Sequence, residues 1–178
     1  FIRARLEVDQ GASTQVIRIF RTRLSDGAFI NEAAARYGYA LALFRGGKYQ
    51  SALAELEIIK DLSDSNPMTV VLEGKIYIKL GDINRGLLEF TKGLRDHPNR
   101  LALIYGYAEA LIMSGRSIEA VQFLSKQIFK NGDDPKLFAL QAEAYAASGD
   151  MVNQYRAQSE VHFLQGNLQH PSWQPLQL

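Results

Sequence analysis

Cysteine is absent from this chain of 178 residues. Without thiols the chain can form no disulfide, no cysteine-ligated zinc site and no thiol nucleophile. It also has no run of about 18 apolar residues, so the sequence predicts no membrane span. Lysine and arginine total 20 against 19 aspartates and glutamates. This balance argues against a nucleic-acid binder, which normally concentrates basic residues on one face.

Residues that could carry catalysis or bind a metal are few and scattered. The three histidines, His97, His162 and His170, lie far apart, whereas a zinc site needs ligands that converge. Asp133-Asp134 lacks the remaining ligands of a calcium loop, and Gly46-Gly47 lacks the Gly-Lys-Ser/Thr context of a phosphate-binding loop. We therefore expect no catalytic residue, no metal and no cofactor in this chain, and no enzymatic activity of its own.

The beginning of the chain has two unusual features. Phe1 stands where a methionine would start a gene product, and no signal peptide follows, so we expect an excised domain or a processed product. The first 23 residues also hold five arginines, diluted by two acidic residues. We interpret them as a solvated helix face, with a lipid or nucleic-acid patch as the alternative. The arginines are Arg3, Arg5, Arg18, Arg21 and Arg23.

Four glycines recur at a fixed interval of 34 residues: Gly47, Gly81, Gly115 and Gly149. A small residue precedes each by seven positions and a large apolar or aromatic residue precedes each by four. An alanine or glycine follows the first three by five positions and a leucine or phenylalanine by nine, but Gln154 and Gln158 take these places in the last. The period and these positions identify the tetratricopeptide repeat (TPR), a pair of helices that buries its apolar face by stacking on its neighbours.

The sequence therefore predicts an all-α TPR solenoid organised as a single domain. We expect a degenerate leading helical hairpin over residues 1–29, four TPR units over 30–165 and a proline-containing tail over 166–178. Residues 1–26 do not follow the glycine register. Helices are expected at 1–8, 32–45, 49–62, 68–80, 83–95, 101–114, 117–130, 136–148 and 152–164, with a further one starting at Ser13 or Thr14.

A narrower resemblance covers nearly the whole chain. Several stretches resemble the C-terminal TPR domain of BepA-like (YfgC-like) zinc metallopeptidases, mostly at positions that support the repeat. They are Ala4-Arg5-Leu6, Ala35–Leu43 with Gly47-Lys48-Tyr49 and Ala52, Ala142–Gly149, Tyr155–Glu160 and Leu164–Leu168.

The resemblance implies a periplasmic location and a role in quality control of outer-membrane protein assembly. Such proteins carry a zinc protease domain with an HExxH motif before their TPR domain. This chain contains no HExxH, so none of the family's catalytic residues has a counterpart here. The ending also departs from the family, because a proline-containing segment replaces a further alanine-containing helix.

The first helix of each unit is expected to line the inner curve of the repeat array. These inward positions predict an apolar and aromatic groove with basic residues in its first half and acidic residues in its second. The alternative is that the apolar side chains only pack between repeats and the charges are solvated. The predicted groove residues are Tyr37, Leu41, Phe44, Arg45, Lys75, Lys79, Tyr105, Glu109 and Glu143.

We therefore predict a non-catalytic protein-interaction module whose groove holds a protein or peptide segment. Its expected partners include its own protease domain and the outer-membrane assembly machinery, without nucleic acid. Leu41 stands where the carboxylate clamp of chaperone-binding TPR domains has an asparagine, so a chaperone tail is disfavoured. Two alternatives stay open: an autoregulatory domain that occupies its own protease's cleft, and a self-associating scaffold.

Overall fold

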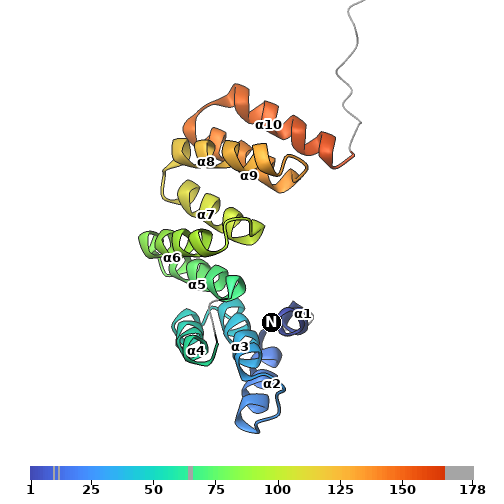
Figure 1. Ribbon diagram of the computed structural model, residues 1–178, viewed down its shortest axis with the longest axis vertical. Helices are drawn as coiled ribbons and strands as arrows, with labels where there is room; N and C mark the ends of the chain where they lie inside the picture. Colours follow the sequence, from blue (N-terminus) through green and yellow to red (C-terminus); the bar gives the residue numbers. More distant parts are fainter. Residues whose placement is uncertain (10, 12, 64–65, 167–178) are drawn as a thin grey trace, which may run out of the picture. The chain divides into compact units, whose positions relative to one another are not determined.

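The computed structural model describes residues 1–9, 11, 13–63 and 66–166, and its regular elements are all α-helices (Figure 1). No strand occurs in these ranges, which confirms the all-α prediction. Of the predicted tail, residues 167–178 lie outside the described part. The helices of the described residues are α1 (Ile2–Asp9), α2 (Ser13–Ser25), α3 (Glu32–Arg45), α4 (Tyr49–Leu62), α5 (Pro67–Lys79), α6 (Ile83–Asp96), α7 (Leu101–Met113), α8 (Ser117–Lys130), α9 (Pro135–Ser148) and α10 (Met151–Leu164).

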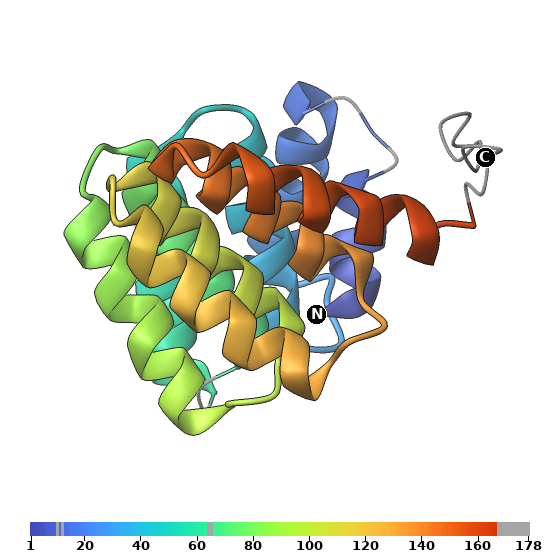
Figure 2. The same ribbon diagram turned by 90° about the horizontal axis from the view of Figure 1, so that it is seen from above.

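The chain divides into two compact units. Unit 1 runs from Phe1 to Gly106 and unit 2 begins at Tyr107, so the boundary falls inside α7 rather than at a junction between repeats. In unit 1, α3 packs against α4 and α5 against α6. In unit 2, α9 packs against both α8 and α10, and Figure 2 shows α9 and α10 side by side. The predicted boundaries at residues 29 and 165 remain predictions.

The four periodic glycines end the first helix of each pair. Each has a positive φ, between 73° and 84°, where a residue with a Cβ would be strained. The residue after each glycine donates its backbone N–H to the carbonyl four residues before that glycine, which is the Schellman arrangement. The bonds run from Lys48 to Leu43, Asp82 to Tyr77, Arg116 to Leu111 and Asp150 to Tyr145, at 2.8, 2.9, 2.9 and 3.0 Å.

Small residues mark the close helix crossings, as the register predicts. Ala40 and Ala108 are fully buried. In the second repeat the crossing of α5 and α6 is closer still, because a Cβ added to Gly86 would lie 3.0 Å from the carbonyl oxygen of Gly74. Two glycines thus let these backbones approach each other directly.

Phe90, nine residues after Gly81, joins one repeat to the next. Its ring is fully buried and fills the space beside Gly74 in its own repeat and Gly106 in the following one. A Cβ would lie 2.8 Å from this ring at Gly74 and 2.3 Å from it at Gly106. We call the residue nine positions after each repeat glycine the stacking residue. The residue nine positions before the next repeat glycine, which is Gly106 for Phe90, is called its facing residue.

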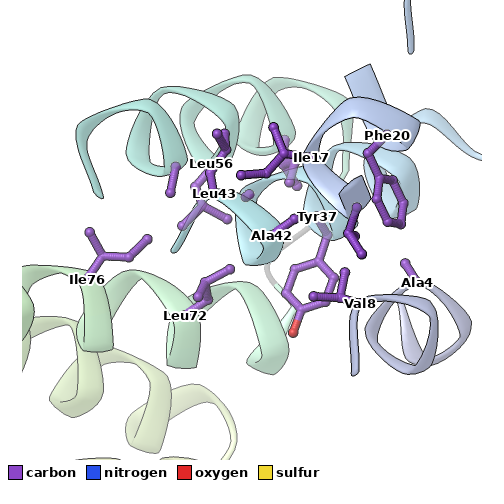
Figure 3. Packing of buried hydrophobic residues seen from close by; sticks show 14 of the residues in the cluster. Ala4, Val8, Ile17, Phe20, Tyr37, Ala42, Leu43, Leu56, Leu72 and Ile76 are labelled. Atoms are coloured by element: carbon purple, nitrogen blue, oxygen red, sulfur yellow. The ribbon is translucent and has the colours of Figure 1, made fainter. Parts of the chain in front are cut away.

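The sizes of stacking and facing residues are complementary along the chain. Where the stacking residue is phenylalanine the facing residue is glycine, and where it is leucine the facing residue is leucine. Both members of each leucine pair are buried, and Leu56 and Leu72 belong to one apolar cluster (Figure 3). The contact is direct for Phe20 with Gly38 and for Phe90 with Gly106. The repeat register gives the other two pairs, Leu56 with Leu72 and Leu124 with Leu140.

The first two helices also follow the repeat register, contrary to the sequence prediction for residues 1–26. Gly11 stands seven residues after buried Ala4, five before buried Val16 and nine before buried Phe20. A Cβ at Gly38 would lie 2.4 Å from the Phe20 ring, so Phe20 is the stacking residue of this pair. The pattern was missed because the connection from Ser25 to Glu32 is two residues longer than that from Leu62 to Pro67.

Polar contacts fix α1 in place over its neighbours. The Arg45 guanidinium at the end of α3 donates to the Val8 carbonyl oxygen at 2.9 Å and to the Asp9 carboxylate. Arg23 of α2 donates to the Glu7 carboxylate at 2.7 Å. This hydrogen bond from Arg23 holds the pKa of Glu7 below its ordinary value. The short α1 is therefore attached at one end to α2 and at the other to α3.

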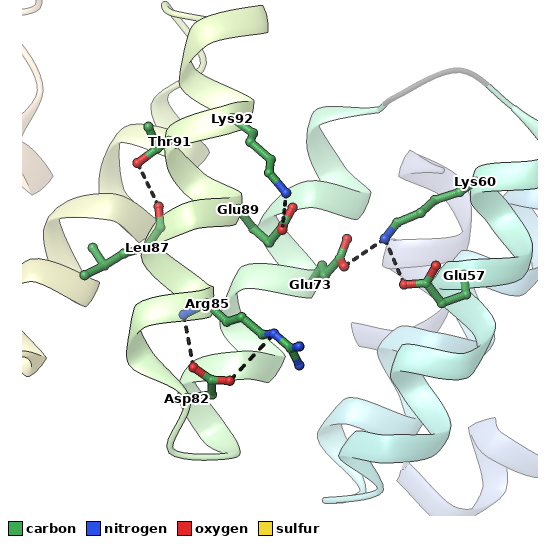
Figure 4. Close-up of polar contacts among 9 residues, drawn as sticks. All are labelled: Glu57, Lys60, Glu73, Asp82, Arg85, Leu87, Glu89, Thr91 and Lys92. Carbon is green, nitrogen blue, oxygen red and sulfur yellow. Dashed lines mark hydrogen bonds and ion pairs between the residues drawn. The ribbon is translucent and has the colours of Figure 1, made fainter.

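One nearly buried carboxylate links the first repeat to the second. Glu73 of α5 is 5% exposed and accepts a 2.9 Å hydrogen bond from the Lys60 ammonium of α4, which also contacts Glu57 (Figure 4). Burial raises the pKa of Glu73, and the bond from Lys60 only partly offsets this effect. The pair therefore orients α4 and α5 and adds little net stability.

The contact between Phe90 and Gly106 predicts a size-dependent coupling. Gly106→Ala should destabilise unit 1, because overpacking costs about 1–3 kcal/mol whereas the gain in helix propensity is about 1 kcal/mol. In a Phe90→Leu background the clashing ring atoms are gone, so the same alanine should become neutral or stabilising. Chemical denaturation of the four proteins in this double-mutant cycle measures the coupling. An equal effect of Gly106→Ala in both backgrounds would show that the ring does not face this glycine.

The Glu7–Arg23 pair predicts a pH-dependent contribution to stability. The folded state lowers the pKa of Glu7 below its ordinary value of 4.5. The ionised carboxylate therefore stabilises the fold at pH values above 4.5, and this contribution is lost as the pH falls through the lowered pKa. Glu7→Gln should therefore reduce the free energy of unfolding at pH 7 by at most about 1 kcal/mol, since the pair is partly solvated. The difference from wild type should disappear in acid.

Denaturation curves at pH 7 and at successive pH values below 4.5 test this expectation, with Glu119→Gln as the control. Glu119 of α8 pairs with Arg116, which directly precedes that helix, so this ion pair links no two helices. A wild-type advantage over Glu7→Gln that persists unchanged in acid would contradict the assignment.

Candidate partner-binding groove

A groove of about 900 Å³ opens in unit 1 beside the starts of α1, α5 and α7. Its lining is mainly apolar, and its charged residues are three arginines without any acidic residue. The lining consists of Phe1, Ile2, Arg3, Arg5, Tyr37, Asn66, Pro67, Met68, Val71, Asn99, Arg100, Leu101 and Ala102.

Tyr37 lies in the wall of this groove, but its ring is only 3% exposed. The ring packs against Phe1 with centroids 5.3 Å apart, and Figure 3 shows it between Val8 and Leu72. Burial raises the pKa of its phenol. Tyr37 was predicted as a groove residue and it does line the groove, but it offers a partner little surface because α1 covers this part of α3.

Arg45, predicted as a groove residue, does not line this groove and is paired within the chain. Its guanidinium is engaged by the Val8 carbonyl and the Asp9 carboxylate at the end of α1. The reason is the same as for Tyr37. Because α1 lies against α3, the end of α1 provides the groups that pair with the Arg45 guanidinium.

Leu41 and Phe44 contribute mainly to the interior of unit 1. Both are half-buried and pack against the apolar cluster around α3. Phe44 also meets the Tyr49 ring at the start of α4, with centroids 5.8 Å apart. Neither side chain lines the 900 Å³ groove, and a role for them in partner binding stays a prediction.

Lys75, Lys79 and Tyr105 do not line this groove but lie farther along α5 and α7. Lys75 lies one helical turn beyond Val71, and Tyr105 one turn beyond Leu101. Lys75 and Tyr105 are half-buried and Lys79 is exposed. Neither lysine has an ion-pair partner among the described residues, so their charges are free to meet an acidic partner.

The two predicted acidic residues both belong to unit 2. Glu109 forms an ion pair with Lys136, with 3.5 Å between the carboxylate oxygen and the ammonium nitrogen. Glu143 is exposed and has no ion-pair partner in the described part of the chain. Glu143 also lines a smaller groove of about 440 Å³ beside α9 and α10. This groove is lined by Ala139, Ala142, Glu143, Ala146, Gln154, Gln158, Val161 and His162.

Sequence reasoning missed the arginines and the helix-start residues of the unit 1 groove. Arg3 and Arg5 were interpreted as a solvated helix face, and Arg100 was not singled out. Met68 and Leu101 begin the first helices of their repeats, where they border the groove. These residues could have been predicted from the repeat register, because equivalent positions of successive repeats lie near one another in a stacked array.

Within the described residues, no group of three histidine, aspartate or glutamate side chains could hold a metal ion. His97 and His162 lie in separate units, and His170 is outside the described residues. None of the helices in the described ranges is long and apolar enough to cross a membrane.

The chain is similar to a curated protease over most of its length. It is 28% identical over 139 residues to the beta-barrel assembly-enhancing protease of Escherichia coli (strain K12). The match covers 77% of this chain but only 28% of that protein. The chain thus spans less than a third of the curated relative, and the protease as a whole is much longer than the region compared.

Solved structures and family models agree on the fold. The C-terminal part of a TPR repeat-containing protein from Cytophaga hutchinsonii matches with a TM-score of 0.73 at 19% identity, over 93% of this chain and 65% of that one. YrrB, a TPR protein with an unusual peptide-binding site, matches with a TM-score of 0.65 at 14% identity, over 93% and 84%. Models of the tetratricopeptide repeat match residues 21–67 and 77–144. The chain is therefore built from tetratricopeptide repeats.

Proposed function

We propose that this chain is a non-catalytic module that binds a segment of a partner protein in the unit 1 groove. The observation that carries the proposal is an open, mainly apolar groove of about 900 Å³ bordered by the first helices of successive repeats. Concave apolar sites with a few charged groups are the usual form of a binding site. Lys75 and Tyr105 lie one turn beyond the groove on α5 and α7, and a bound segment would continue past the groove toward them.

We further propose that the module serves a metallopeptidase domain that lies elsewhere in a longer protein. The similarity to part of the beta-barrel assembly-enhancing protease supports this role. The module would then bring substrates or partners to the protease during quality control of outer-membrane proteins in the periplasm. Its likeness to the solved TPR structures supports the fold of this module and not the identity of its partner.

Two other roles remain as alternatives. The module could regulate its own protease domain by occupying the cleft of that domain, or it could associate with further copies of itself. Removing the module from the longer protein should raise peptidase activity in the first case. In the second case the mass of the isolated chain in solution should rise with its concentration.

Site-specific crosslinking tests the groove as the partner-binding surface. A photoreactive residue at Val71 or Lys75 should capture partner proteins in cells, because both positions face the proposed segment. The matched controls are Gln50 and Asn84, which are exposed on the second helices of their repeats. Partners captured at the two control positions and at neither groove position would refute the proposal.

A further inference from the structure

The charges around the unit 1 groove have one sign. Of its 13 lining residues three are arginines and none is aspartate or glutamate, although the chain as a whole has a net charge of only +1. Arg3 and Arg5 come from α1, and Arg100 precedes α7. Residues far apart in the sequence thus place three guanidinium groups around one apolar surface.

These guanidinium groups are weakly engaged within the chain. Arg3 is 87% exposed and contacts Glu7 one turn away at 3.3 Å, and Arg5 is 58% exposed and lies 4.0 Å from Asp9. Pairs of this kind on a helix surface are worth about 0.2–0.5 kcal/mol. Arg100 is exposed and makes no ion pair with any described residue. All three could therefore accept a carboxylate from outside at little cost.

The floor of the groove suits apolar side chains. Met68 and Val71 of α5 are half-buried, and Leu101 of α7 and Ile2 of α1 are exposed. Methionine is flexible and polarizable, so it adapts to side chains of different shape. The volume lies at the upper end of the range of about 300–1,000 Å³ that is typical of ligand sites. There is room for several side chains of a bound segment.

We infer that this groove recognises an acidic protein segment that carries apolar side chains. Carboxylates of the segment pair with Arg3, Arg5 and Arg100, in the planar bidentate geometry that guanidinium favours. The apolar side chains between them rest on Met68, Val71 and Leu101. This inference rests on the proposed function and adds the chemistry of the partner.

A polynucleotide would offer negative charge as well, but the floor does not suit one. Proteins bind single strands by stacking bases on exposed aromatic rings. The groove has two aromatic residues, of which Tyr37 is buried and Phe1 packs on it. The apolar aliphatic floor therefore favours a protein segment.

Fluorescence anisotropy with defined probes tests this inference. The first probe is a labelled peptide of glutamates and leucines with an amidated C-terminus, so that its side-chain carboxylates alone provide negative charge. The second has lysines in place of the glutamates, and the third is a single-stranded DNA of similar length. We expect the acidic peptide to bind at least about tenfold more tightly than either, with an affinity that falls as salt is added.

Charge reversal identifies the groove as the site. Arg100→Glu should weaken binding of the acidic peptide by about tenfold or more. Arg18→Glu makes the same change in net charge on an exposed arginine of α2 outside this groove, and should leave the affinity within about twofold. Leu101→Ser should weaken binding of the acidic peptide without changing how that binding depends on salt. Circular dichroism and melting curves check that each variant is folded.

Other results would overturn the inference. Equal binding of the acidic and basic peptides, equal effects of Arg100→Glu and Arg18→Glu, or tighter binding of DNA would each exclude an acidic segment in this groove. The proposed function would survive such a result if the cellular crosslinks at Val71 and Lys75 persist. If those crosslinks are absent while the acidic peptide binds as expected, recognition of an acidic segment is supported and the proposed recruitment of partner proteins is refuted.

Discussion

The structure depends on one recurring contact, in which the stacking residue of a repeat fills the space beside the first helix of the next. A repeat cannot bury its apolar face alone, so this contact provides much of what holds the chain together. Phe90 shows how tight it is, because its ring leaves no room for a Cβ at either Gly74 or Gly106. The glycine turns and small crossing residues serve this contact by setting the distance between helices.

The same stacking determines which surfaces remain for a partner. Since α1 follows the repeat register, it lies against α3 as the first helix of a preceding repeat would, and its end engages Arg45. The first regular repeat therefore has little free inward surface. The groove opens instead beside the starts of α1, α5 and α7, where arginines from distant parts of the sequence line one surface.

The sequence predicted the helices closely, because their ends carry local signals. The α3, α4 and α8 helices have the predicted bounds, and Asn31, Asn66, Asp82, Asp134 and Asp150 accept the capping bonds expected of such residues. The site was harder to predict, since it depends on contacts between segments far apart. Nothing local indicates that Asp9 neutralises Arg45 or that Arg100 joins Arg5. The Gly11 register was hidden by two extra residues in one connection.

The pairing of stacking and facing residues makes the repeats unequal as building blocks. The first regular repeat faces its predecessor with Gly38 and stacks on its successor with Leu56, whereas the second does so with Leu72 and Phe90. Loss or duplication of one repeat would bring leucine onto glycine or phenylalanine onto leucine, leaving a void or a clash. Loss or duplication of two neighbouring repeats keeps every junction matched. An array of this kind can therefore change its length most easily by two repeats at a time, whether in evolution or in protein design.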